Sequence, residues 1–171
     1  MGRDKALLPF RGGTLVESVA TAVARAAGSA TLVGAPEFYE HLGFPAVADL
    51  YPGEGPLGGI LTALQHTMAD WNLVTACDMP ALTAGLLAAL LDAAESQDPD
   101  ALVPVGPSGS PEPLCAVYHR RALQPLARQF AGGTRRLVEA LEALRAVPYP
   151  VAEVSCFQNV NTPQEWSACD L

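Results

Sequence analysis

The chain has 171 residues, half of them hydrophobic, which is enough for one domain with a buried core. Its formal net charge of -8 would repel a nucleic-acid backbone or an anionic membrane surface, so we expect neither as a partner. The longest apolar run, at 86–91, is far shorter than the roughly 20 residues that cross a bilayer.

Helical and strand patterns alternate in the first half of the chain. Thr14 is the expected N-cap of a helix over 14–27, with Glu17 three residues later and Gly28 as its stop. Short strands are predicted at 30–34, 46–49 and 72–77. Further helices are predicted at 36–42, 57–68 and 83–95. This alternation predicts an α/β layered domain with a largely parallel sheet, whose ligands bind beyond the carboxyl ends of the strands.

The second half has a looser pattern. Strands are predicted at 101–105 and 114–119, separated by a Gly-, Pro- and Ser-rich surface loop at 106–113. Helices are predicted near 122–130 and 135–145. No linker or repeat divides the chain, so we expect a single domain over 1–171.

The start of the chain has neither the pattern of a secretory signal nor that of a transit peptide. The four cysteines are scattered without a C-x-x-C pair, which favours reduced thiols over disulfides or a zinc site. Both features favour a cytoplasmic protein.

A Gly-rich segment at 51–60, YPGEGPLGGI, precedes a predicted helix. Glycines let the backbone approach a ligand closely, and a helix N-terminus offers unpaired N–H groups, so Gly55, Pro56 and Leu57 are candidate binding residues. An ordinary turn before a helix explains the same composition.

Asp78 follows a buried-looking strand in the segment VTACDMP, and Asp49 follows the short strand before it. A carboxylate at a strand end suits Mg²⁺, which binds through one or two carboxylates together with substrate phosphates. The alternative for Asp78 is a cap for the turn into the next helix.

Lys5 lies on a predicted loop and is a candidate for neutralising a polyphosphate in an otherwise acidic protein. A solvated surface lysine is the alternative. Transfer onto a nucleotide phosphate requires groups that position the phosphates and neutralise their charge. A lysine, a Gly-rich helix start and an acid at a strand end can together supply them, so we expect these three features to form one site.

Five segments in this order resemble the molybdenum cofactor guanylyltransferases of the MobA type: MGRDKALLPFRGGTLVE, DLYPGEGPLGGI, ACDMPAL, PLCAVY and NVNTPQEW. The resemblance covers nearly the whole chain. It implies a Rossmann-like, doubly wound, mostly parallel sheet in the three-layer α/β/α arrangement of the nucleotide-diphospho-sugar transferases.

The resemblance also implies an activity: GMP from GTP is joined to molybdopterin carrying molybdenum, with release of pyrophosphate and with Mg²⁺ as the metal. Lys5 would contact the GTP phosphates, Asp49 the guanosine, and Asp78 both GTP and Mg²⁺. Asn159 and Asn161 would lie near the pterin. Cofactor-insertion proteins or molybdoenzymes are the implied protein partners. Other members carry Asn after the second strand, where this chain has Gly34 and Ala35, so that guanosine contact is not carried over.

Members of that family begin with a strand and a Gly-rich loop, of which only Met1 and Gly2 have counterparts here. We therefore expect the first, central strand of the sheet to be missing, and a start site placed too far downstream to be the reason. Two other functions stay open. One is a cytidylyltransferase for the same pterin or another small-molecule nucleotidyltransferase, and the other is a non-catalytic nucleotide-binding remnant.

Overall fold

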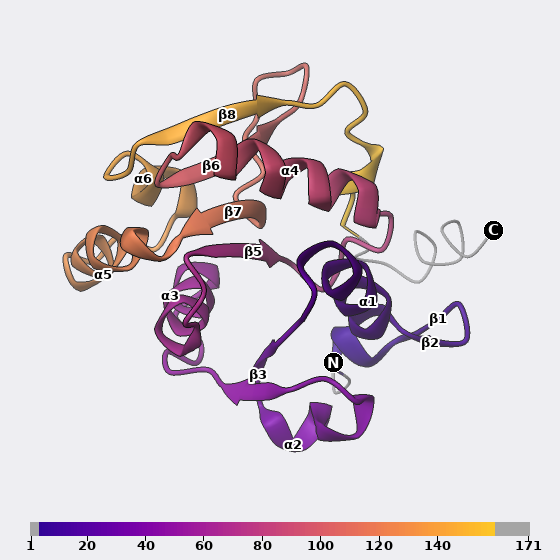
Figure 1. Ribbon diagram of the computed structural model, residues 1–171. Coiled ribbons are helices and arrows are strands. Elements are labelled where there is room, and N and C mark those ends of the chain that lie inside the picture. The colour runs from indigo at the N-terminus through magenta and orange to yellow at the C-terminus, as the bar shows by residue number, and fades with distance from the viewer. Residues whose placement is uncertain (1–3, 160–171) are drawn as a thin grey trace.

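A four-stranded sheet forms the centre of this computed structural model, which describes residues 4–159 (Figure 1). Its strands lie in the order β5 (Trp71–Thr75), β7 (Cys115–His119), β6 (Ala101–Val105) and β8 (Ala146–Pro150). Strand β7 is antiparallel to both β5 and β6, whereas β8 is parallel to β6. Three of the four strands therefore run in the same direction, which confirms the expected mostly parallel sheet.

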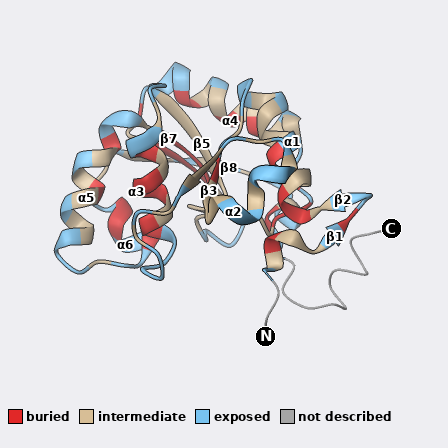
Figure 2. Cartoon of the chain, turned by 90° about the horizontal axis from the view of Figure 1, so that it is seen from below, coloured by how far each residue is buried: buried red, intermediate tan, exposed pale blue. Residues whose placement is uncertain are grey.

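Helices cover both faces of this sheet. The helices α1 (Leu15–Ala27) and α4 (Ala84–Gln97) lie on one face, and α3 (Pro56–His66), α5 (Leu123–Ala131) and α6 (Leu137–Leu141) lie on the other (Figure 2). Alternate residues of a strand point to opposite faces, so Leu102 packs with α4 while Val103 packs with α3. The three-layer α/β/α arrangement is confirmed.

A separate parallel pair is formed by β3 (Leu32–Gly34) and β4 (Ala46–Ala48). Between these strands the chain forms α2 (Pro36–Tyr39) and a 3-10 turn at Glu40–Leu42. Within residues 4–159 no hydrogen-bonded ladder joins this pair to the four-stranded sheet. A small cluster of Ala6, Val16, Ala20 and Leu32 packs α1 against β3 instead.

The ends of α1 agree with the sequence signals. The Thr14 hydroxyl accepts from Glu17 N at 3.3 Å, and Glu17 Oε2 accepts from Thr14 N at 2.8 Å, which is a capping box. Gly28 ends the helix in the left-handed region with φ 82°.

The predicted helix over 135–145 is wrong in its extent. Helix α6 covers only Leu137–Leu141, and β8 follows at Ala146–Pro150. Pro148 and Pro150 cannot continue a helix, and they are tolerated in β8 because that strand lies at the edge of the sheet.

A short hairpin precedes helix α1. A hairpin of β1 (Pro9–Phe10) and β2 (Gly13–Thr14) was not expected from the sequence. Its turn places Arg11 at φ 47° and Gly12 at φ 83°, the positive angles that two-residue hairpin turns require.

No helix within residues 4–159 has the length and apolar character needed to span a membrane.

Candidate functional site

Lys5 and Asp78 meet beyond the carboxyl end of β5. Lys5 Nζ donates to Asp78 Oδ2 at 2.9 Å, and the two side chains are 33% and 21% exposed. Lys5 opens the 3-10 helix η1 (Lys5–Leu7), whose N-cap Asp4 accepts from Ala6 N at 3.0 Å. The structure therefore brings together two predicted site residues that lie 73 positions apart in the sequence. Their roles in binding and catalysis stay predictions.

Asp78 fits Mg²⁺ only in combination with substrate phosphates. Among residues 4–159 no three His, Cys, Asp or Glu side chains group closely enough to hold a metal ion by themselves. Mg²⁺ in nucleotide sites keeps several waters and takes one or two carboxylates plus phosphate oxygens. A partly exposed carboxylate beside a lysine meets that requirement.

Asp49, at the end of β4, is held in a fixed orientation. Its Oδ1 accepts from the Thr62 hydroxyl at 2.9 Å and from Tyr51 N at 3.0 Å. Thr62 is fully buried in α3, and its Oγ1 also accepts from Leu50 N at 3.1 Å. Asp49 N in turn donates to Gly34 O at 3.0 Å, which joins the ends of β4 and β3.

The Gly-rich segment forms the start of α3, as expected. Gly55 is the N-cap, with φ 83° and ψ -177°, a conformation that is essentially restricted to glycine. A Cβ atom at Gly55 would meet no atom within 4 Å, so the backbone is open to a ligand there. Pro56 is exposed, whereas Leu57 is completely buried and offers a ligand only its backbone. Binding at Gly55, Pro56 and Leu57 stays a prediction.

A second contact links the end of β3 to the Lys5 turn. The Tyr39 hydroxyl donates to Asp4 Oδ2 at 2.5 Å. Burial raises the pKa of Tyr39, and the hydrogen bond to Asp4 raises it further, so the hydroxyl stays protonated. The sequence analysis missed this contact because Tyr39 and Asp4 belong to no common motif.

Cys77 precedes Asp78 and is not a nucleophile in this setting. Burial, followed by the negative charges of Asp78 and Asp4, raises the pKa of the Cys77 thiol to about 11. The thiolate is the reactive form, and at neutral pH it is scarcely populated here.

Of the two predicted pterin-side residues, only Asn159 belongs to the described part of the chain. Asn159 is exposed, two positions after the 3-10 helix Ser155–Phe157, and no hydrogen bond described within residues 4–159 connects it to Lys5, Asp49 or Asp78. Asn161 lies outside the described residues.

A hollow of about 500 Å³ lies between the β1–β2 hairpin, α1 and the start of α4. Arg11, Glu17, Arg25 and Pro80 are among its lining residues. None of the predicted site residues lines this hollow.

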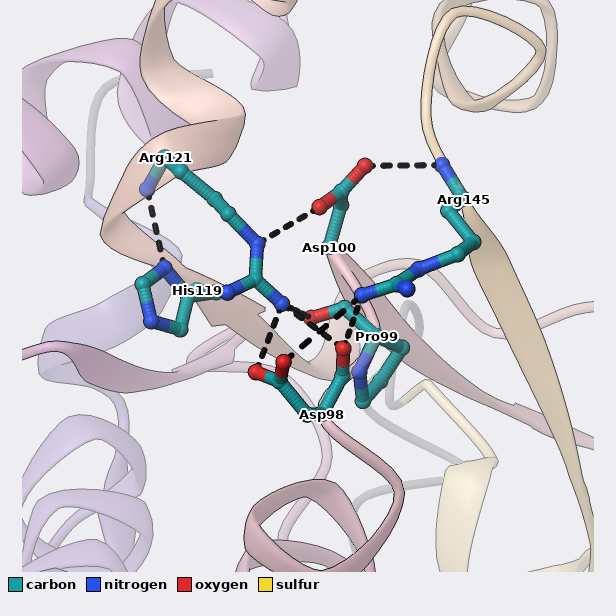
Figure 3. Close-up of polar contacts among 6 residues, drawn as sticks. All are labelled: Asp98, Pro99, Asp100, His119, Arg121 and Arg145. Carbon is teal, nitrogen blue, oxygen red and sulfur yellow. Dashed lines mark hydrogen bonds and ion pairs between the residues drawn. The ribbon is translucent and has the colours of Figure 1, made fainter.

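The strand ends opposite those near Asp78 carry a network of ion pairs (Figure 3). Arg121 follows β7 and donates to Asp98 Oδ1 and Asp100 Oδ1, both at 2.7 Å, while Arg145 N donates to Asp100 Oδ2 at 3.0 Å. These residues join the starts of β6 and β8 to the end of β7. Every cation in this network already faces a carboxylate, so we assign it to structure and not to ligand binding.

The hydrogen bonds of this network shift both acids toward ionisation. The hydrogen bond from Arg121 lowers the pKa of Asp98. For Asp100, burial acts to raise the pKa, but hydrogen bonds from Arg145 N and the Arg121 side chain outweigh it, and the net shift is downward.

Comparisons with known proteins show the family to which the chain is similar. The family model of the MobA-like NTP transferase domain matches residues 1–147. A probable molybdenum cofactor guanylyltransferase from Deinococcus radiodurans is 35% identical over 164 residues, which is 96% of this chain and 84% of that protein. A molybdenum cofactor guanylyltransferase from Cupriavidus metallidurans is 29% identical over 172 residues, again 96% of this chain and 84% of the relative.

Solved structures are similar over almost the entire chain. The molybdopterin-guanine dinucleotide biosynthesis protein A from Archaeoglobus fulgidus superposes with a TM-score of 0.81 at 30% identity, covering 99% of this chain and 90% of that one. The 2-C-methyl-D-erythritol 4-phosphate cytidylyltransferase from Thermus thermophilus gives a TM-score of 0.77 at 20% identity, covering 97% and 92%. At that identity the second comparison concerns the fold alone.

Proposed function

The chain belongs to the MobA-like NTP transferase family, and from this premise we propose that it transfers GMP from GTP to molybdopterin carrying molybdenum. The products are the guanine dinucleotide form of the molybdenum cofactor and pyrophosphate. The observation that carries the proposal is the Lys5 and Asp78 pair at the carboxyl end of β5, in a chain whose relatives are named as guanylyltransferases.

In this reaction a phosphate oxygen of the pterin attacks the α-phosphorus of GTP in line. The new P–O bond forms as the bond between the α-phosphorus and the bridging oxygen breaks, and its electron pair leaves with pyrophosphate. Such a transfer depends on positioning and charge neutralisation, so no protein nucleophile is required. The protonated Cys77 thiol agrees with that mechanism.

Lys5 and Asp78 have different electrostatic roles in the proposed reaction. The Lys5 ammonium balances negative charge on the β- and γ-phosphates, which become the leaving group. Asp78 is the residue that would hold Mg²⁺. When bound, Mg²⁺ supplies positive charge that screens the polyphosphate and orients it.

The guanosine binds along the end of β4 and the start of α3. Asp49 presents a carboxylate that Thr62 and Tyr51 N already orient, and a carboxylate accepts two N–H bonds from a guanine edge or bonds to ribose hydroxyls. Gly55, Pro56 and the backbone of Leu57 supply a surface without side-chain obstruction. Asn159 and Asn161 are proposed to contact the pterin.

The decisive experiment is an assay of the purified chain with GTP, Mg²⁺ and molybdopterin carrying molybdenum. We expect pyrophosphate release that depends on both the pterin and the metal, together with a guanine dinucleotide product identified by mass spectrometry. Absence of that product, with a folded protein that still binds GTP, would contradict the proposal.

A cytidylyltransferase for the same pterin is the alternative within the same enzyme class, and competition between nucleotides separates the two. Unlabelled GTP should displace a fluorescent guanine nucleotide at concentrations where CTP does not. Preference for CTP would assign the alternative. Nucleotide binding without any transfer product would instead identify a non-catalytic nucleotide-binding protein.

The reaction is proposed to occur in the cytoplasm. Its product would then pass to cofactor-insertion proteins or directly to molybdoenzymes. The scattered cysteines, of which Cys77, Cys115 and Cys156 are free thiols among the described residues, agree with a reducing compartment.

A further inference from the structure

Tyr39 lies between two elements that carry the proposed site. It is the last residue of α2, five positions after the end of β3, and its hydroxyl donates to Asp4 Oδ2 at 2.5 Å. The other carboxylate oxygen of Asp4 accepts from Ala6 N at 3.0 Å. Both carboxylate oxygens of Asp4 are therefore engaged in hydrogen bonds.

Gly34 determines where the Tyr39 ring lies. A Cβ atom at Gly34 would approach Tyr39 Cε2 to 2.7 Å, closer than real contacts of this kind. The ring thus occupies the space that a side chain at the end of β3 would fill. Gly34 O also accepts from Asp49 N at 3.0 Å, so the ring rests where the ends of β3 and β4 meet.

Lys5 has one acidic neighbour in the sequence, Asp4, and another in space, Asp78. Asp4 adjoins Lys5 in the sequence, yet Lys5 Nζ forms its ion pair with Asp78 Oδ2, at 2.9 Å. A hydroxyl that donates to a carboxylate forms a charge-assisted bond, which is stronger than one between neutral groups. Holding Asp4 on Tyr39 directs the Lys5 side chain toward Asp78 and the end of β5.

We propose that Tyr39 is a positioning residue, which acts through Asp4 to hold the Lys5 ammonium at Asp78, where the triphosphate of the nucleotide binds. This inference rests on the proposed function for the identity of the nucleotide. The position of Lys5 itself does not depend on that identity.

The test uses Tyr39→Phe, which keeps the ring and removes the hydroxyl, and Gly34→Ala, which displaces the ring. In both variants we expect the KM for GTP to rise about 3- to 10-fold, as for loss of one hydrogen bond, with kcat changed less than KM. Tyr149→Phe is the matched control, because Tyr149 lies on β8, away from Lys5, and no described hydrogen bond involves its hydroxyl.

A second measurement needs no nucleotide. Lys5 is the only lysine in the chain, so selective isotope labelling of lysine gives a single side-chain NMR signal. In Tyr39→Phe this signal should move toward its position in Asp78→Asn, and in Tyr149→Phe it should not move.

The outcomes separate the two proposals. A lower thermal midpoint in Tyr39→Phe with an unchanged lysine signal and unchanged KM would reduce Tyr39 to a structural role and overturn the inference. A shifted lysine signal in a protein that does not turn over GTP would uphold the inference and overturn the proposed function. In the Asp4→Ala background, Tyr39→Phe should add no further change in KM, and a further change would also overturn the inference.

Discussion

The atoms Lys5 Nζ and Asp78 Oδ2 lie 2.9 Å apart, but we expect removal of the two side chains to affect different kinetic constants. Asp78→Asn keeps the size of the side chain and removes the charge that would hold Mg²⁺. We expect guanylyl transfer to fall by about 100-fold or more while the fold is retained, because the metal stabilises charge in the transition state. The measurement is kcat with varied Mg²⁺, alongside circular dichroism.

Asp92→Asn is the control for Asp78→Asn, since it removes the same charge from an exposed position on α4. Asp92→Asn should retain full activity. Near-normal turnover of Asp78→Asn would remove Asp78 from the mechanism.

Lys5→Ala should mainly weaken GTP binding. The ammonium meets the phosphates in the ground state and in the transition state alike, so its loss acts on KM more than on kcat. We expect KM to rise roughly tenfold, by the strength of a charge-assisted contact, and Lys5→Arg to recover part of it. Unchanged GTP affinity in Lys5→Ala, measured by calorimetry, would leave Lys5 as an ordinary surface lysine.

The sequence identified these residues better than it identified their neighbours. Lys5 and Asp78 stand in segments with recognisable composition, so their contact could be predicted. That Asp49 belongs to the same site stays a prediction. Tyr39 and Thr62 have no such signal: each acts through one hydroxyl whose partner lies 35 or 13 residues away. Such contacts depend on the angle at which a helix meets a strand, and residue spacing does not encode that angle.

The start of α3 illustrates a constraint at the scale of an element. Gly55→Ala introduces a Cβ where φ is 83° and ψ is -177°, so the backbone must strain or rearrange. We expect a loss of about 1–3 kcal/mol in the free energy of unfolding, measured with urea. Weaker GTP binding should accompany it.

Gly59→Ala provides the matched control in the same helix. A Cβ at Gly59 meets no atom within 4 Å, and Ala has a higher helix propensity than Gly by about 1 kcal/mol. Gly59→Ala should therefore keep or increase stability. Equal destabilisation by both substitutions would show that the conformation of Gly55 is not what matters.

The ion-pair network that joins the starts of β6 and β8 to the end of β7 should make the protein sensitive to acid. The pKa of Asp100 is lowered in the folded state from a value of 3.8, so its contribution to stability is present above that value and is lost as the pH falls through the lower, folded pKa. Asp100→Asn should lower the free energy of unfolding at neutral pH and reduce its decline below about pH 4. Glu37→Gln, on the exposed side of α2, should do neither.

Elements were predicted well where both of their ends carry signals. Helix α1 has a capping box and a C-terminal glycine, and its bounds follow from them. Helix α6 has no side-chain cap at Arg136, and its apolar spacing continues into the segment before β8, so the helix was predicted too long. β8 was missed because its two prolines weigh against a strand, and only its place at the sheet edge makes them acceptable.

At the scale of the whole molecule, the β3–β4 pair and the four-stranded sheet are two parts that share no ladder within the described residues. Amide hydrogen exchange should therefore be slowest in β6 and β7, whose residues are almost all buried, and faster in β3 and β4. Adding GTP and Mg²⁺ should slow exchange selectively in β3 and β4, since the proposed site spans both parts. Uniform exchange rates across the two parts, measured by mass spectrometry, would contradict this expectation.

The division of the sheet also gives the substrate a second effect. A nucleotide that contacts Asp49 at the end of β4 and Asp78 beyond the end of β5 binds only the assembled arrangement. It therefore stabilises that arrangement by RT ln(1 + [L]/Kd), or about 2.7 kcal/mol at a hundredfold excess over Kd. Proteases cut the opened form of the protein, and nucleotide binding lowers the population of that form by the factor 1 + [L]/Kd. The lifetime of the protein in a cell should then follow the supply of nucleotide. Starvation for GTP would reduce the amount of the protein as well as the rate at which each molecule catalyses the transfer.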